Sequence, residues 1–294
     1  MYWSSLARSS YSLIRGLNVL RINASARAEP VLITGALAEA EVGATIQLPP
    51  GGSGVNPERQ RKPHPHSAFI DPTGMRVLVS ELGTDQITSY TIDTVSGRLR
   101  ENSIFAAAPG SGPRHLCFHP SGRWFYSINE LDCTIVAVAY DPATGRMGPV
   151  IHSVSTLPAG YNNHDHARAK NVKGEPASGP NSPPGQTNTT ADVHCTPCGR
   201  FVYGSNRGHD SLVCFSVADD GRLKLVGWTW SGGEHPRNFG IHPSGRWLVC
   251  ANQDTDNVVV LVSTHENWCA QTYGRRADGR LQAKLRQMGA LLAK

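Results

Sequence analysis

Side chains that can carry charge recur at fixed distances from a repeated Pro-x-Gly turn in this chain of 294 residues. The glycines of the four turns are Gly74, Gly122, Gly199 and Gly245. Three polar residues stand eight positions before a turn glycine, and three stand eight positions after one. They are His66, Arg114 and Arg237 before the turns, and Glu130, Arg207 and Gln253 after them. Where such side chains converge, the arginines can bind an anion, and the glutamate and histidine can move protons.

Four histidines close to these positions extend the candidate substrate-binding site, because imidazole titrates near neutral pH. They are His64, His115, His194 and His209. Structural roles remain open as alternatives. Arg114 and Glu130 can form an ion pair within one hairpin, and His66 can cap the entrance of a strand. Asp210 can hold Arg207 or bind loop amides.

The turns belong to a repeat of short strands. Their glycines are 48, 77 and 46 residues apart, and removing a stretch of 30 residues rich in Gly, Pro, Asn and Ser (159–188) shortens the middle interval to 47. An apolar run precedes each turn and two follow it, and in three repeats a second glycine turn leads to a fourth run. Four short strands in about 40–50 residues are typical of a propeller blade. The sequence therefore predicts an all-β fold, a β-propeller with four clear blades.

The hairpin that each turn closes predicts where the charged residues lie. Positions equally far before and after the turn are cross-strand neighbours in an antiparallel pair, give or take one residue. The charged residues should therefore gather at one mouth of the propeller, near its axis. Asn129, Asn206 and Asn252 share one register and are predicted to stabilise turns. His119 and His242 lie at the far end of their hairpins and are predicted to be structural.

Four segments carry a resemblance to a known family: NPERQRKPHPHSAFIDPTG, GSGPRHLCFHPSGRWFYSINELDCT, TTADVHCTPCGRFVYGSNRGHDS and HPRNFGIHPSGRWLVCANQDTDNVVV. They resemble the lactonase family of seven-bladed propellers, which includes one type of 6-phosphogluconolactonase and the carboxy-cis,cis-muconate lactonising enzymes. The resemblance runs from about Gly52 to Val262. The family's functional residues in its PHxH, GPRH, NEL and NRG motifs fall on His66, Arg114, Glu130 and Arg207.

The resemblance implies hydrolysis of a sugar lactone, most directly 6-phospho-D-glucono-1,5-lactone, without a metal or organic cofactor. Glu130 would be the general base, Arg114 would stabilise the oxyanion, and His66 would orient or protonate the leaving alkoxide. Arg207 and Arg237 would bind the phosphate. A muconate lactonising enzyme would use the same arginines for carboxylates. A propeller that only binds partners is a third possibility, since fold does not determine function.

The chain departs from the family in the number of blades. Family members close seven blades, whereas four hairpins are intact here and residues 30–51 supply only part of a fifth. A propeller short of blades exposes strand edges, and such edges pair readily with another chain. Either self-association through the open edges or poor solubility is therefore expected.

The two ends differ from the body in composition. Residues 1–28 hold four Arg and no acid, as in an organelle transit peptide or an arbitrary extension. Residues 265–294 hold six basic and two acidic residues, and apolar residues from Leu281 to Leu292 follow helical spacing. The expected organisation is an N-terminal extension (1–29), a propeller domain (30–264) with a long loop (159–188), and a basic, helical tail (265–294).

Charge and cysteine content narrow the partners and the compartment. Residues 1–28 and residues 265–294 each carry a net charge of +4, so residues 29–264 carry 5 − 4 − 4 = −3. Because this body of the chain is mildly acidic, nucleic acid is not expected as a partner. The chain contains no run of about 18 apolar residues, so no membrane-spanning helix is predicted. The seven cysteines are scattered and suit a reducing compartment. A cytoplasmic location follows, or a mitochondrial one if residues 1–28 are a transit peptide. The Cys195/Cys198 pair is predicted to fill a turn rather than bind zinc.

Overall fold

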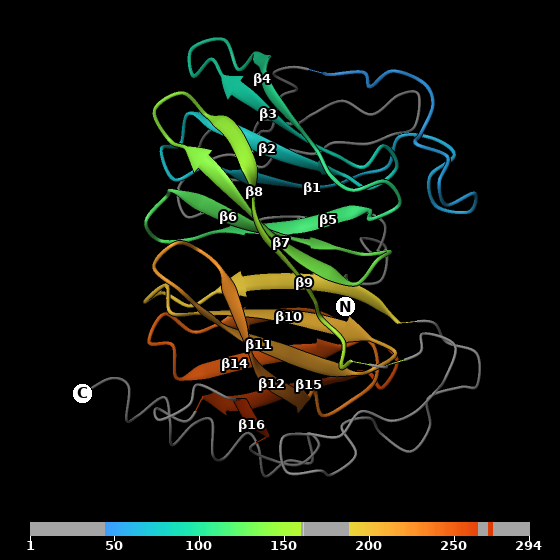
Figure 1. Ribbon diagram of the computed structural model, residues 1–294, viewed down its shortest axis with the longest axis vertical. Coiled ribbons are helices and arrows are strands. Elements are labelled where there is room, and N and C mark those ends of the chain that lie inside the picture. The colour runs from blue at the N-terminus through green and yellow to red at the C-terminus, as the bar shows by residue number, and fades with distance from the viewer. Residues whose placement is uncertain (1–44, 160, 162–187, 264–269, 273–294) are drawn as a thin grey trace, which may run out of the picture. The chain divides into compact units, whose positions relative to one another are not determined.

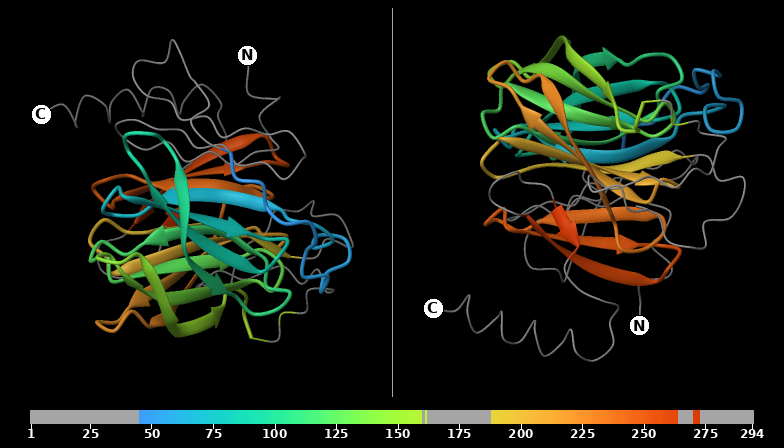
Figure 2. Two further views of the ribbon diagram at one scale, coloured as in Figure 1. Left: turned by 90° about the horizontal axis from the view of Figure 1, so that it is seen from above. Right: turned by 60° about the horizontal axis from the view of Figure 1, so that its bottom comes forward.

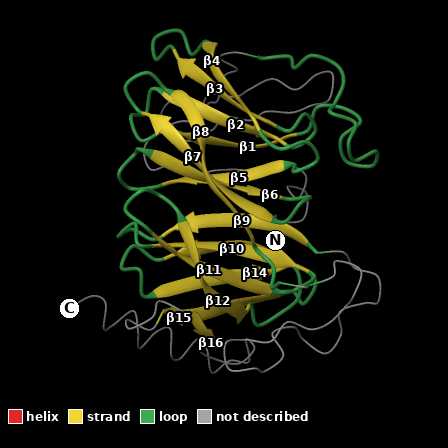
Figure 3. Cartoon of the chain, viewed as in Figure 1, coloured by secondary structure: helices red, strands yellow, loops and turns green. Residues whose placement is uncertain are grey.

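The computed structural model describes residues 45–159, 161, 188–263 and 270–272. Within these ranges all regular elements are strands (Figure 3), and none of the described residues forms a helix able to cross a membrane. The predicted N-terminal extension, most of the 159–188 loop and most of the basic tail lie outside the described residues. Residues 45–51 carry no strand, so the described part of the chain shows no fifth blade.

Sixteen strands form four four-stranded sheets, and neighbouring strands of each sheet follow one another along the chain (Figure 1). Sheet 1 contains β1 (Pro65–Ile70), β2 (Arg76–Glu81), β3 (Gln86–Ile92) and β4 (Leu99–Ala106). Sheet 2 contains β5 (Pro113–Phe118), β6 (Trp124–Asn129), β7 (Thr134–Asp141) and β8 (Arg146–Ser155). Sheet 3 contains β9 (Thr189–Cys195), β10 (Phe201–Arg207), β11 (Ser211–Val217) and β12 (Leu223–Trp230). Sheet 4 contains β13 (Pro236–Ile241), β14 (Trp247–Asn252), β15 (Asn257–Ser263) and β16 (Ala270–Thr272). The four predicted blades are confirmed.

The strands fall into two compact units, which are described one at a time. Unit 1 holds the chain up to residue 154 with residues 220–222, and therefore sheets 1 and 2. Unit 2 holds residues 155–219 and those from 223 onward, and therefore sheets 3 and 4. In the views of Figure 2, the strands of unit 1 run from cyan to yellow-green, and those of unit 2 run from yellow to red.

Each unit has its own apolar core between its two sheets. In unit 1 this core includes Leu78 from sheet 1 and Leu116 and Phe125 from sheet 2, all 0% exposed. In unit 2 it includes Tyr203 from sheet 3 and Leu248 from sheet 4. Burial of these side chains supplies the main driving force that holds the first strands of neighbouring sheets side by side. Those first strands carry five of the candidate site residues, which are His66, Arg114, His115, His194 and Arg237.

The Pro-x-Gly turns have one construction in all four sheets. Their glycines have φ between 69° and 74°, a conformation that favours glycine. The side chain that precedes the proline bonds to the side chain that follows it. The pairs are Asp71–Thr73, His119–Ser121, Thr196–Cys198 and His242–Ser244. The structural roles predicted for His119 and His242 are therefore confirmed, and Cys198 sits in the turn as a free thiol.

A β-bulge near the other end of the hairpins positions the charged residues. The register of β1, β5 and β13 against the next strand skips one residue, and these residues are His66, Arg114 and Arg237. A proline without an N–H group begins each of the three strands, directly before the bulged residue. Bulges redirect side chains and are frequent beside functional sites. The sequence-based pairing is one residue off along the hairpin, where Leu116 pairs with Ser127, and the bulge adds one more residue at Pro113, which pairs with Asn129.

The asparagines at the end of the second strands bind the following turn. The Nδ2 groups of Asn129 and Asn252 donate to Thr134 Oγ1 and Asn257 Oδ1, both at 2.9 Å, and Asn206 Nδ2 donates to Ser211 Oγ at 3.3 Å. Each partner lies five residues ahead. The predicted turn-stabilising role of the three asparagines is confirmed.

Candidate functional site

A buried ion pair lies at one end of sheet 2 in unit 1. Arg114 Nε donates to Glu130 Oε2 at 2.7 Å, and each side chain is 2% exposed. Arg114 comes from the bulge of β5, and Glu130 directly follows β6, where its backbone N–H donates to Gly112 O at 2.8 Å. The predicted cross-strand contact between Arg114 and Glu130 is confirmed. A guanidinium at this distance favours the ionised carboxylate.

A second guanidinium occupies the other oxygen of the same carboxylate. Arg59, from the segment before β1, forms an ion pair with Glu130 Oε1, and its side chain is 37% exposed. Sequence reasoning missed Arg59, because its spacing does not distinguish it from its basic neighbours Arg61 and Lys62. Glu130 is therefore held between one buried and one accessible arginine.

Three of the predicted histidines lie in a row beside this pair. The ring centres of His64 and His66 are 5.9 Å apart, and those of His66 and His115 are 5.3 Å apart. The outer face of this row ends at Phe69, whose ring lies 5.8 Å from that of His115. The imidazoles are half-buried, so a bound ligand can reach them.

The charges around His64 keep its imidazole neutral. Burial lowers the pKa of His64, and the guanidiniums of Arg59 and Arg114 lower it further against the opposing effect of Glu130. A neutral imidazole can accept a proton or a hydrogen bond but does not act as a cation. The backbone N–H of His64 donates to the buried carboxylate of Glu81, a residue that sequence reasoning also missed.

In unit 2, Arg207 ends β10 and is 6% exposed. Its Nη2 donates to Thr190 O at 2.7 Å, which ties the guanidinium to the neighbouring β9. Asp210, three residues ahead, accepts from the N–H groups of Gly208 at 3.1 Å and His235 at 2.8 Å. Of the two roles left open for Asp210, the described contacts show the binding of loop amides.

Arg237 is the second predicted arginine of unit 2, and like Arg207 it affects the pKa of His235. His235 Nδ1 lies 3.3 Å from Asp254 Oδ2. Burial lowers the pKa of His235, as do Arg207 and Arg237, against the opposing effects of Asp254 and Asp210. Both predicted arginines are thus near enough to His235 to lower its pKa, and the three residues are named the basic cluster of unit 2. The exposed Gln253 donates to Asp254 Oδ1 at 3.3 Å.

His194 is oriented by a buried carboxylate in unit 2. Its Nε2 lies 3.2 Å from Asp192 Oδ2, and the same oxygen accepts from Asn238 Nδ2 at 2.7 Å. Burial lowers the pKa of His194, but Asp192 outweighs this effect and the net pKa is raised. The raised pKa favours the protonated ring, and with its side chain 36% exposed His194 can be reached by an anion.

His209 differs from the other predicted histidines because it is 1% exposed. Its Nδ1 lies 2.6 Å from Ser211 Oγ, and its ring packs edge-on against Tyr161 and Trp228. Burial lowers the pKa of His209 to about 3. This environment argues against the predicted contact with substrate and favours a structural role, because a buried neutral ring offers little to an anion.

We expect His209 to make the protein sensitive to mild acid. The folded state keeps the imidazole neutral down to about pH 3, whereas the unfolded chain protonates it near pH 6.5. Stability should therefore fall as the pH drops through this window, by up to about 1.4 kcal/mol per pH unit. Denaturant unfolding between pH 4 and 7 should show a shallower dependence for His209→Asn than for wild type. An equal slope in the variant would contradict the prediction, and the exposed His242→Asn serves as the control.

No group of three His, Cys, Asp or Glu side chains in the described ranges is arranged to hold a metal ion. The predicted absence of a cofactor stays a prediction.

The candidate residues thus form two sets, one in each unit. Unit 1 brings together His64, His66, Arg114, His115 and Glu130, and adds Arg59. In unit 2, Arg207 and Arg237 both lower the pKa of His235, and His194 and His209 lie in separate hydrogen-bond networks. The unit 1 set combines a carboxylate, imidazoles and guanidiniums, which are the groups that acid–base catalysis on an anionic substrate requires.

Comparison with known proteins places the chain in a family. The family model described as "Lactonase, 7-bladed beta-propeller" matches residues 27–269. A 6-phosphogluconolactonase of Bacillus subtilis is 34% identical over 205 residues, which cover 69% of this chain and 51% of that protein. A 6-phosphogluconolactonase of Formosa agariphila is 33% identical over 216 residues, which cover 71% and 54%. The chain spans about half the length of the curated relatives it matches.

Solved structures show the same architecture. A crystal structure of a Lactobacillus plantarum protein superposes with a TM-score of 0.67 at 26% identity, covering 87% of this chain and 64% of that one. The periplasmic gluconolactonase of Pseudomonas aeruginosa gives a TM-score of 0.69 at 24% identity, covering 89% and 66%, and supports the fold alone. Together with the sixteen described strands and the matched family model, these likenesses show that the chain belongs to the lactonase family of seven-bladed β-propellers.

Proposed function

We propose that the protein hydrolyses a sugar lactone, with 6-phospho-D-glucono-1,5-lactone as the leading substrate. The observation that carries this proposal is Glu130, a buried carboxylate held by Arg114 at 2.7 Å next to a row of half-buried imidazoles. Relatives named 6-phosphogluconolactonase support the choice of substrate. The chain spans only about half of those relatives, so the activity is a proposal for this chain.

The proposed chemistry assigns one task to each group of unit 1. Glu130 accepts a proton from a water molecule while the water oxygen forms a bond to the lactone carbonyl carbon. Arg114 keeps Glu130 in place, and the guanidiniums stabilise the developing oxyanion, because their several N–H donors fit an anionic oxygen. The ring C–O bond then breaks, and His66 orients or protonates the leaving alkoxide. The overall reaction consumes one water and yields a hydroxy acid.

The basic cluster of unit 2 offers guanidiniums to an anionic group such as a phosphate. Arg207 is fixed by its bond to Thr190 O, and a planar guanidinium can bind phosphate through two hydrogen bonds. Arg237 contributes a second charge from the bulge of β13.

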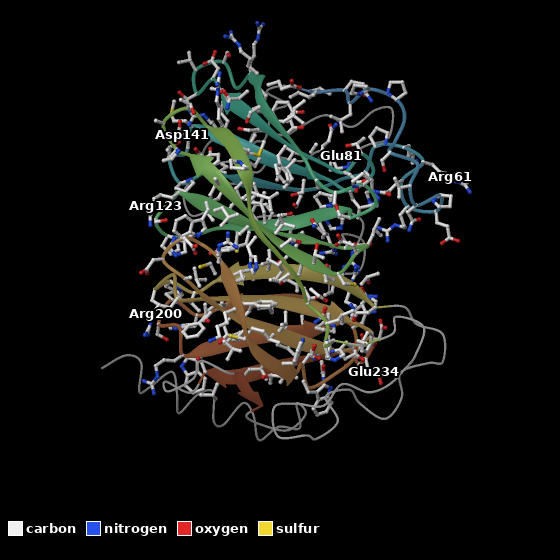
Figure 4. The ribbon with its side chains drawn as sticks, viewed as in Figure 1. Arg61, Glu81, Arg123, Asp141, Arg200 and Glu234 are labelled. Carbon is white, nitrogen blue, oxygen red and sulfur yellow. The ribbon has the colours of Figure 1, made fainter. Side chains whose placement is uncertain are left out.

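Changing Arg207→Ala should mainly weaken substrate binding. Ground state and transition state both carry the phosphate, so we expect KM for the phosphorylated lactone to rise about 10- to 100-fold with little change in kcat. Steady-state kinetics checks this, with the exposed Arg200→Ala (Figure 4) as a matched control and Arg207→Lys as a less disruptive variant. A KM unchanged in folded Arg207→Ala would remove the assignment.

The closest alternative is a muconate-type lactonising enzyme, in which the same arginines bind carboxylates and one proton moves without net hydrolysis. NMR of the products from the phosphorylated lactone and from a carboxymuconate separates the two. We expect 6-phosphogluconate from the first substrate and no ring closure of the second. The reverse pattern would establish the alternative. Turnover of neither substrate would leave a binding scaffold.

A further inference from the structure

The two guanidiniums on Glu130 differ in how freely they can move. Arg114 lies in the bulge of β5 and is 1% exposed, so it remains with Oε2. Arg59 binds Oε1 with a side chain that is 37% exposed. Because the Arg59 guanidinium reaches solvent and Arg114 does not, a competing anion can contact Arg59 but not Arg114. Arg59 is therefore the partner that a competing anion can draw away.

The backbone that carries Arg59 is firmly anchored, so only the side chain needs to move. The neighbouring Gln60 is 0% exposed, and its Nε2 donates to Leu82 O at 2.9 Å and to Asp85 Oδ1 at 2.7 Å. The segment also packs backbone against backbone at Gly52, where an added Cβ would lie 2.1 Å from Gln60 O. This packing fixes the position from which the Arg59 guanidinium reaches Glu130.

The position of Arg59 also explains why Glu130 is inaccessible. Both carboxylate oxygens are paired and the residue is 2% exposed, so a water molecule cannot pass a proton to it while Arg59 stays in place. Withdrawal of Arg59 would uncover Oε1 and leave Oε2 on Arg114. The same withdrawal would remove a neighbouring positive charge, and the carboxylate would become a better base.

We propose that Arg59 determines substrate specificity by exchanging its ion pair with Glu130 for one with the anionic group of the substrate. This inference rests on the proposed lactone hydrolysis. An anionic lactone supplies the competing charge and frees Glu130 Oε1 to accept the proton of the attacking water. A neutral lactone supplies no such charge, so Arg59 remains on Glu130 and the base stays blocked. The enzyme thereby selects phosphorylated lactones at the catalytic step as well as in binding.

The matched pair of variants is Arg59→Gln and Arg61→Gln. Arg61 lies two residues ahead on the same segment, is exposed, and points away from the sheets in Figure 4. The substrates are 6-phospho-D-glucono-1,5-lactone and the neutral D-glucono-1,5-lactone, each measured against its spontaneous hydrolysis. Loss of a charge-assisted contact should lower kcat/KM of Arg59→Gln for the phosphorylated lactone roughly 10- to 100-fold. Its kcat/KM for the neutral lactone should stay equal or rise, because Glu130 is no longer covered.

A pH profile provides a readout that a purely structural residue would not move. The acidic limb of kcat/KM, which reports the free enzyme, should shift to higher pH in Arg59→Gln, because Glu130 has lost one of its two cations there. Arg61→Gln should match wild type in the selectivity ratio and in the pH profile. An unchanged selectivity ratio in Arg59→Gln, or an equal loss on both lactones, would overturn the proposal. Wild-type protein that hydrolyses neither lactone would instead remove the proposed function itself.

Discussion

Replacing Glu130 with glutamine should abolish most turnover. The amide keeps the shape of the side chain but cannot accept the proton of the attacking water, so we expect kcat to fall by about 10³-fold in the folded protein. The variant also leaves the buried Arg114 without its anion, and we expect a loss of about 3 kcal/mol in the free energy of unfolding. Turnover should therefore be measured well below the melting temperature, with the folded fraction taken from circular dichroism.

The control for this variant is Glu101→Gln, because Glu101 is an exposed carboxylate on β4 of the same unit. It should match wild type in both turnover and stability. Normal turnover by the folded fraction of Glu130→Gln would show that Glu130 is only structural. The base would then be reassigned to His66 or His194.

Replacing Asp85 with asparagine should cause the largest loss of stability. The Asp85 carboxylate is 4% exposed and accepts from the N–H groups of Gly110 at 2.7 Å and Gly112 at 2.8 Å. It also accepts from Gln60 Nε2 at 2.7 Å. An amide would place its own N–H₂ against one of these donors, so we expect a loss of about 3–5 kcal/mol. Asparagine tolerates the φ of 58° at this position, so backbone strain does not add to the effect.

Chemical denaturation measures this effect, and Asp141→Asn is the control. Asp141 is exposed (Figure 4), and its carboxylate accepts local hydrogen bonds from Ala143 N and Thr144 Oγ1. The control should change stability by less than about 1 kcal/mol. Similar unfolding midpoints for Asp85→Asn and Asp141→Asn would show that the three contacts of Asp85 contribute little.

The repeat made the sheets and much of the site predictable. Constant spacing from the turn glycines was enough to pair Arg114 with Glu130, because an antiparallel hairpin converts equal spacing into contact. The same reasoning placed Asn129 in its turn. The bulge at Arg114 was missed because the spacing argument assumes regular pairing along the whole hairpin, whereas the register skips one residue between Pro113 and His115.

Residues outside the repeat were beyond the reach of this reasoning. Arg59 precedes β1 and meets Glu130 only because Gln60 anchors its segment to the turn after β2. Such a long-range contact leaves no periodic signal. The burial of His209 against Tyr161 and Trp228 was missed for another reason, because its position in the repeat does not reveal which side chains cover it in the fold.

The most direct measurement is the rate at which 6-phospho-D-glucono-1,5-lactone disappears at neutral pH with and without the full chain. Proton release in a weakly buffered solution follows the reaction. A carboxylate base beside guanidiniums predicts acceleration that is proportional to protein concentration, saturates with substrate and yields 6-phosphogluconate. Equal rates with and without folded protein would contradict the account.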